Sequence, residues 1–210
     1  RAFPGGKHVE FRQDPSLRQI SEGQRLAYGR ALVPNYRIHK ADHILAIDAD
    51  FLGTFGFPAY QMASFGRVRS VRGKRKKMAR LVVAESMMTL TGTNADERYA
   101  LRPGDQATFA LALAAELVLN QGRPAPAGKA QLAEYEPAAL AKKLGHTEGL
   151  FKAGHFEKVI AKLAGDLWEH RGRGLVSAGS PLAAGKYARA LQGSVNLLNS
   201  ILGNDGVTVD

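Results

Sequence analysis

The stretch LVVAESMMTLTGTNADERYALRPGDQATFALALAAEL, residues 81–117, changes its hydrophobic period along its length, and this change decides the fold class. It begins within an apolar strand predicted at 80–84, and a Thr- and Gly-containing turn separates that strand from a short one at 98–101. An Arg-Pro-Gly corner then leads into a strongly apolar helix at 106–120, which must be largely buried. Strand, turn, strand, corner and helix in this order predict part of an α/β fold.

The alternation of helix and strand periods continues on both sides of this stretch. The other predicted elements are an extended piece around 7–11, a helix at 16–30, a strand at 43–47, a helix from Pro58, a helix at 155–170, a strand at 174–178 and a helix ending near Leu202. The order helix, strand, loop, helix thus occurs twice. It predicts a doubly wound, mostly parallel, Rossmann-like sheet with helices on both faces and any ligand site at the carboxyl ends of the strands.

The chain is expected to form one domain from two halves. The first α/β half would span 1–125, a helical excursion or linker rich in Pro, Gly and Ala would span 126–152, and the second half would span 153–210. No apolar run approaches the roughly 18 residues of a membrane-spanning helix, and no signal-peptide pattern is present. Because the sequence begins at Arg1 without an initiator Met, we interpret it as a piece of a longer protein.

The formal net charge of +10 is concentrated in one predicted loop, 67–80, which holds eight Lys or Arg residues and no acid. Such a loop could bind acidic lipid headgroups or an acidic protein. It has no interleaved aromatic residues for base stacking, so nucleic acid is not favoured, and a solvated insertion between two strands is the simpler interpretation. The anion- or partner-binding residues would be Arg72, Lys74, Arg75, Lys76 and Lys77.

Several candidate sites carry a competing structural interpretation. Asp48 and Asp50 follow the predicted strand at 43–47, where they could hold magnesium, act as an acid–base pair, or simply cap the loop. His39 and His43 are four residues apart but flank the start of a strand, where this spacing does not bring side chains together. We interpret both as ordinary surface or turn histidines.

The turn GSPLAAGKY, residues 179–187, imitates a phosphate-binding loop. Five residues instead of four separate its glycines, and Tyr187 replaces the Ser or Thr that would contact magnesium. The absence of cysteine excludes disulfides, thiolate catalysis and iron–sulfur clusters ligated by this segment. From these motifs we predict no catalytic group and no metal site in this chain.

Longer strings carry a family resemblance. KADHILAIDADFLGT (40–54), the stretch from 81 to 114, and HRGRGLVSAGS (170–180) with NLLNSILGNDGVTV (196–209) resemble, in order and spacing, the cofactor-binding sheet of the molybdopterin oxidoreductases. The phrases DADFLGT, VVAES followed by TLTG, and LGNDGVTV are similar to the large iron–sulfur, molybdopterin-like subunit of alternative complex III and related quinone-linked respiratory complexes. The resemblance covers most of the chain from about residue 20 to 210.

The resemblance also implies where a pyranopterin guanine dinucleotide would lie. The family's Gly-x-Asn-Pro loop falls on residues 48–51 and its Asp-Pro-Arg triplet on 85–87, so most of the family's contact residues are replaced. Its Arg-Pro-Gly-Thr-Asp motif keeps 102–104 but has Gln at the base-reading position. The implied cofactor-binding positions, vestigial or weak, are Asp48, Asp50, Glu85, Thr91, Arg102, Gly104, Asp105 and Gln106.

The resemblance therefore implies a fragment of an oxidoreductase subunit of a respiratory electron-transfer complex. This segment would be a cofactor-less structural and docking domain, itself not catalytic, and iron–sulfur clusters would lie in the missing part of the protein. Its partners would be other subunits on the periplasmic side of the bacterial inner membrane. Two alternatives stay open: a catalytic domain that binds molybdopterin guanine dinucleotide, and a polyanion-binding module that uses loop 67–80.

Overall fold

The computed structural model describes residues 5–7, 16–71, 76–126, 128–179 and 186–210. Most of the predicted extended piece around 7–11 and most of the 179–187 turn lie outside the described residues, as do Arg72, Lys74 and Arg75 of the basic loop.

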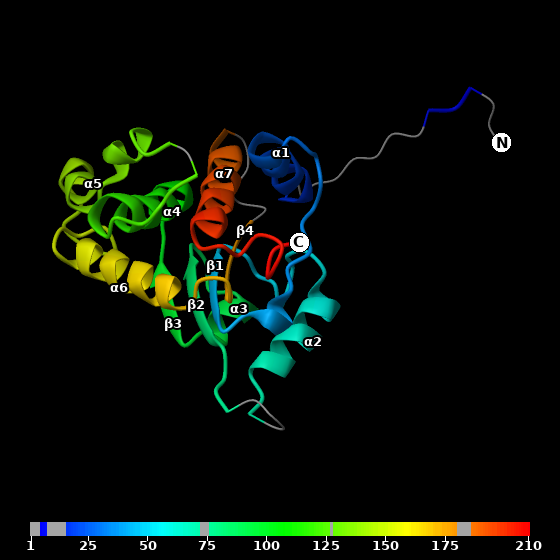
Figure 1. Ribbon diagram of the computed structural model, residues 1–210. Helices are drawn as coiled ribbons and strands as arrows, with labels where there is room; N and C mark the ends of the chain where they lie inside the picture. The colour runs from blue at the N-terminus through cyan, green and yellow to red at the C-terminus, as the bar shows by residue number, and fades with distance from the viewer. Residues whose placement is uncertain (1–4, 8–15, 72–75, 127, 180–185) are drawn as a thin grey trace.

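The described residues form a four-stranded, all-parallel sheet. Its strands are β1 (His43–Ile47), β2 (Arg80–Glu85), β3 (Glu97–Ala100) and β4 (Gly174–Ala178), in the order β3-β2-β1-β4. From the central β1 the chain first moves through β2 to β3 and then crosses to β4 on the other side (Figure 1). This arrangement confirms the predicted α/β fold with a parallel sheet, and it places strands from both predicted halves in one sheet.

Helices cover both faces of the sheet (Figure 1). Leu45 and Ile47 of β1 face one apolar layer, and Ile44 and Ala46 face the other, because successive side chains of a strand point to opposite faces. The first layer is completed by α4 (Gln106–Ala115), η2 (Glu116–Asn120), η3 (Gln131–Tyr135), α5 (Pro137–Leu144), α6 (His155–Glu169) and α7 (Lys186–Ile201). The second is completed by α1 (Ser16–Tyr28), η1 (Ile38–Lys40) and α2 (Pro58–Val68).

Helix α4 is the most enclosed helix of the first layer, as its apolar sequence predicts. Phe109 and Leu113 of α4, and Leu117 of η2 directly after it, are fully buried in the cluster shared with α6 and α7. The predicted helix at 106–120 is not uniform, because its last turn, η2, widens to a π-helix around the buried Glu116. None of the described helices combines the length and the apolar character that crossing a membrane requires.

Side chains from α7 and the segment after it cover the outer edge of β4. The Asn199 side-chain amide donates to the backbone oxygen of Val176 at 2.8 Å and accepts from its backbone nitrogen at 3.1 Å. The Gln192 amide donates to the Ala178 oxygen at 2.6 Å, and the Thr208 hydroxyl donates to the oxygen of Gly174. The edge that would otherwise carry free backbone groups is thus hydrogen-bonded to side chains.

One short helix lies where the sequence predicts only a turn. α3 (Leu90–Thr93) follows β2, and its N-cap is Thr89, whose hydroxyl accepts from the backbone nitrogen of Gly92 at 3.1 Å. α3 lies at the carboxyl edge of the sheet. There Thr91 donates to the Asp50 carboxylate, and the N-cap Thr89 donates to the Glu85 carboxylate.

Candidate functional site

Most of the residues implicated by the sequence lie at one edge of the sheet. Asp48 follows β1, Glu85 ends β2, and the corner from Arg102 to Gln106 follows β3. The carboxyl ends of parallel strands meet at the same edge, so segments far apart in the sequence are brought together there. Their side chains form three separate hydrogen-bonded networks and one pocket.

The first network joins the loop after β1 to the start of α4. The Asp48 carboxylate accepts from the backbone nitrogen of Ser86 at 2.7 Å, from the Ser86 hydroxyl at 3.0 Å and from the Gln106 side-chain amide. The Gln106 oxygen in turn accepts from the backbone nitrogen of Gly104 at 2.8 Å. Asp48 holds a positive φ of 48°, a conformation that costs energy in residues other than Gly, so this network fixes a strained turn.

The second network holds the loop that contains Asp50. One carboxylate oxygen accepts from the Thr91 backbone nitrogen at 3.0 Å and from the Thr91 hydroxyl at 2.8 Å. The other oxygen accepts from the backbone nitrogen of Thr54 at 3.2 Å, and the Thr91 hydroxyl accepts from the backbone nitrogen of Leu52. Asp50 therefore caps its own loop and fastens it to α3, which is the structural role that the sequence left open for it.

The third network surrounds Glu85, whose side chain is only 1% exposed. Its carboxylate accepts from the Thr89 backbone nitrogen at 3.2 Å, from the Thr89 hydroxyl at 2.7 Å and from Arg98 Nε at 2.6 Å. Gly92 packs directly on it, since a Cβ added to Gly92 would lie 1.8 Å from Glu85 Oε1. These neighbours therefore shield the Glu85 carboxylate from solvent.

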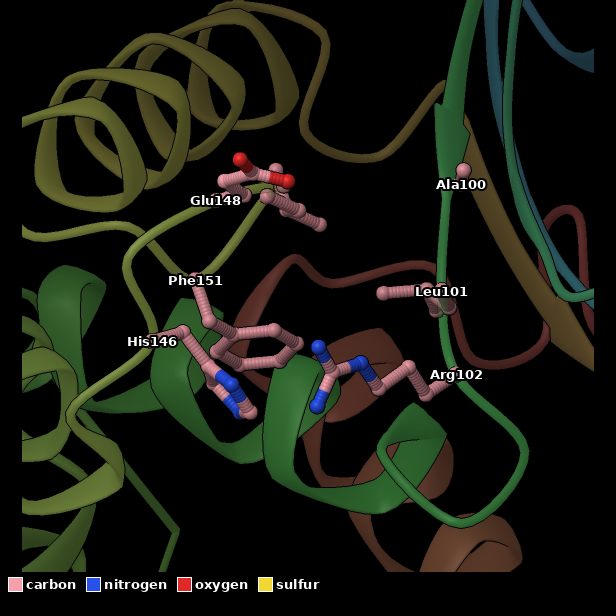
Figure 2. A pocket seen from close by; sticks show the side chains of 8 residues that line it. Ala100, Leu101, Arg102, His146, Glu148 and Phe151 are labelled. Atoms are coloured by element: carbon pink, nitrogen blue, oxygen red, sulfur yellow. The ribbon is translucent and has the colours of Figure 1, made fainter.

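The side chain of Arg102, in the corner after β3, takes part in none of the three networks. The exposed Arg102 side chain lies in a pocket with His146 and Phe151 (Figure 2). Gly104 has a φ of +99°, which favours glycine, and it turns the chain into α4. Burial raises the pKa of the Asp105 carboxyl, and His146 and Arg102 oppose this shift by their positive charge.

The basic loop is less open at its ends than the sequence indicates. Arg69, just after α2, forms a two-fold ion pair with Asp96, with nitrogen–oxygen distances of 2.7 and 3.0 Å. Arg80 begins β2 and forms an ion pair with Glu97. Lys76 is exposed. Arg69 and Arg80 are therefore paired within the folded structure and do not belong to a solvated insertion.

The two histidines spaced four apart do not share a site. His39 lies in η1, and His43 begins β1 with its ring 5.4 Å from the ring of His170. The interpretation of His43 as a surface or turn histidine is wrong, because its side chain is 0% exposed. Burial, with a smaller contribution from His170, lowers the pKa of His43 to about 4. No cluster of three or more metal-ligating side chains is found in the part of the chain that the structure describes.

Sequence reasoning missed the partners of the predicted residues. Ser86, Thr89 and Arg98 supply the donors to the carboxylates, and the pocket beside Arg102 is completed by His146 and other residues between α5 and α6. Only Thr89 had a local signal, because Thr is a preferred residue just before a helix.

The fold and these networks define an α/β domain with a parallel sheet and a polar carboxyl edge. A scan of models of known protein families and a search of curated proteins found no match to this chain.

Proposed function

We propose that this chain is part of a molybdopterin-oxidoreductase-like subunit of a respiratory electron-transfer complex and serves there as a structural and docking domain without a bound dinucleotide. The resembling strings on residues 40–54 and 81–114 support the family. The parallel order of β1, β2 and β3, which carries these strings to one edge, is compatible with it. In this proposal the parent protein carries iron–sulfur clusters outside this chain and lies on the periplasmic side of the bacterial inner membrane.

One observation carries the cofactor-less role: internal donors already occupy most acceptor positions of the carboxylates at three of the implied contact positions. Asp48, Asp50 and Glu85 each accept three or more hydrogen bonds from this chain's own backbone and side chains. A carboxylate that reads a guanine or a ribose must instead offer free acceptor positions to the ligand. These residues are bound into the framework.

The residues present do not fit a pyranopterin guanine dinucleotide. Two carboxylates, Asp48 and Asp50, stand where phosphates would approach, and like charges repel. Gln106, at the base-reading position, is 3% exposed and is bonded to Asp48 and to the Gly104 nitrogen. Opening this site would break several buried hydrogen bonds, at about 1–3 kcal/mol for each polar group left without a partner.

An exposed apolar group beside the networks supports a docking role. Met87 and Met88 lie between β2 and α3, and Leu90 begins α3; their side chains are 63%, 62% and 52% exposed. Apolar side chains grouped on a surface are typical of contacts with another protein. We therefore place the contact with a neighbouring subunit of the complex at this turn.

Metal and nucleotide analysis of the full-length protein tests the cofactor-less role. We expect substoichiometric molybdenum, no pterin fluorescence and no guanine nucleotide released on acid denaturation. Glu85→Gln and Gln106→Leu would be compared with Glu134→Gln, which changes an exposed carboxylate away from the site. Stoichiometric molybdenum in the wild-type protein would contradict the cofactor-less role. A fall in molybdenum content in folded samples of the first two variants, and not in the third, would establish the dinucleotide-binding alternative.

Assembly of the parent complex tests the docking role separately. Replacing Met87 and Met88 with Ser leaves the buried networks untouched, so the variant is expected to fold normally. We expect it to co-purify with less of the neighbouring subunits than the wild-type protein does. Unchanged subunit composition would remove this turn from the interface.

A further inference from the structure

A pocket of about 280 Å³ lies at the carboxyl end of β3, separate from the three networks. One wall is the end of β3 and the corner after it, residues 100–102, and the other is the segment 146–151 between α5 and α6 (Figure 2). The sequence indicated the carboxyl edge and Arg102, but it gave no sign that the segment 146–151 would form the second wall. Its volume is slightly below the roughly 300 Å³ at which the range of typical small-molecule pockets begins, so the pocket is too small to enclose a dinucleotide.

The apolar part of this pocket is preformed. Leu101, Leu150 and Phe151 line it, and all three side chains are buried. The Leu101 backbone nitrogen donates to the backbone oxygen of Glu85 at 3.0 Å, which extends the β2–β3 ladder to the pocket wall. The Phe151 ring stacks on the Phe156 ring with centroids 4.5 Å apart. A ligand would therefore meet walls that the protein core already holds in place.

The polar part of the pocket is divided by charge. Figure 2 shows the Arg102 guanidinium on the same side as His146, with Glu148 on the opposite side. Within the described part of the chain, neither the guanidinium of Arg102 nor the ring of His146 has a hydrogen-bond or ion-pair partner. A guanidinium with free N–H groups at an apolar wall is suited to a carboxylate, which it can bind through two parallel hydrogen bonds.

Asp105 lies close enough to influence both basic groups. Its carboxyl oxygen Oδ2 is buried and accepts no hydrogen bond from any residue that the structure describes. Burial raises the Asp105 pKa, and the positive charges of His146 and Arg102 act in the other direction. An ionised Asp105 therefore offsets part of the positive charge of Arg102 and His146 without forming a hydrogen bond to Arg102.

We infer that this pocket binds a small organic acid that also carries a hydrogen-bond donor, that is, an amino or hydroxy acid with an apolar side chain. Arg102 and His146 hold its carboxylate, and Glu148 accepts a hydrogen bond from its amino or hydroxyl group. The buried apolar walls contact its side chain. This site is independent of the proposed lack of a dinucleotide, because none of the three networks has to open for the acid to enter.

Three matched probes test this assignment in NMR titrations of the 210-residue chain. L-phenylalanine carries a carboxylate and an ammonium group, 3-phenylpropanoate lacks the ammonium, and 2-phenylethylamine lacks the carboxylate. We expect saturable shifts of the backbone amides of 100–102 and 146–151 with both acids, tighter binding of L-phenylalanine, and no shifts with the amine. Failure of both acids to bind at millimolar concentrations would overturn the assignment.

Four variants separate the roles of the side chains. Arg102→Gln is expected to weaken both acids roughly 10-fold or more, because it removes charge-assisted hydrogen bonds. Glu148→Gln should weaken only L-phenylalanine, and Asp105→Asn should tighten 3-phenylpropanoate roughly three-fold by removing a nearby negative charge. Arg30→Gln, at an exposed position elsewhere, is the matched control. Unchanged affinity in Arg102→Gln, with a dispersed spectrum showing a folded chain, would contradict the proposal.

Discussion

Replacing Glu85 with Gln tests whether this buried carboxylate serves the fold. The Glu85 side chain is 1% exposed and the Arg98 side chain 29% exposed, with 2.6 Å between Oε1 and Nε. The contribution of this ion pair to stability should therefore lie between two limits. Exposed ion pairs contribute about 0.2–1 kcal/mol, and removing one partner of a fully buried pair costs about 3–5 kcal/mol.

The structure gives an intermediate magnitude for this substitution. A Gln side chain keeps the shape of Glu85, and its oxygen can still accept from the Thr89 backbone nitrogen, so mainly the charge is lost. We expect Glu85→Gln to lower the free energy of unfolding by about 2 kcal/mol. Glu85→Ala also removes the bond from the Thr89 hydroxyl and leaves a cavity, so its cost is expected to be about 4 kcal/mol.

Urea unfolding of a double-mutant cycle measures the interaction directly. The cycle comprises wild type, Glu85→Gln, Arg98→Met and the double variant, and we expect a coupling free energy of about 1–2 kcal/mol. Glu134→Gln, at an exposed carboxylate, should leave stability within about 0.5 kcal/mol of wild type. A coupling free energy near zero with unchanged stability would refute the conclusion that Glu85 is part of the framework.

Three further predictions concern stability. As the pH falls from 6.5 toward 4, the free energy of unfolding should drop by up to about 3 kcal/mol. In this range His43, which is buried and has its pKa lowered to about 4, binds a proton only in the unfolded chain. Urea unfolding at several pH values should therefore show a flatter dependence of stability on pH for His43→Leu than for wild type. Asn199→Leu should cost about 3 kcal/mol and accelerate amide exchange in β4, since it leaves two backbone groups without partners. Gly92→Ala should cost about 2 kcal/mol or more in thermal unfolding, because its Cβ would lie 1.8 Å from Glu85 Oε1, whereas Gly66→Ala, with open space around the added Cβ, should not be destabilising.

The strands could be predicted because their sequences differ sharply from what flanks them. Residues 43–47 and 174–178 are short apolar runs between polar segments, and the structure has β1 and β4 with those bounds. Helix α4 was predictable for a related reason, since a helix that is apolar on all sides has to be buried. The π-turn at η2 had no such signal, because it depends on how Glu116 packs.

The candidate site was predictable in location but not in its contacts. The sequence places carboxylates after β1 and at the end of β2, and parallel strands carry them to one edge. Whether a carboxylate is available to a ligand depends on donors such as Ser86 and Thr89, whose positions are set by tertiary packing. The pocket beside Arg102 was missed for the same reason, because the segment at 146–151 meets β3 only in the folded chain.

The cover that Asn199 and its neighbours give to the outer edge of β4 has a consequence for association between molecules. An uncovered edge strand presents free backbone groups on which a strand from another chain can add, and such addition can propagate into fibres. Here an incoming strand would first have to displace the Asn199 amide from both backbone groups of Val176. Within the described sheet, strand-by-strand growth is thus restricted to the side of β3, where Glu97 and its cationic partners Arg80 and Lys162 provide charges that disfavour it.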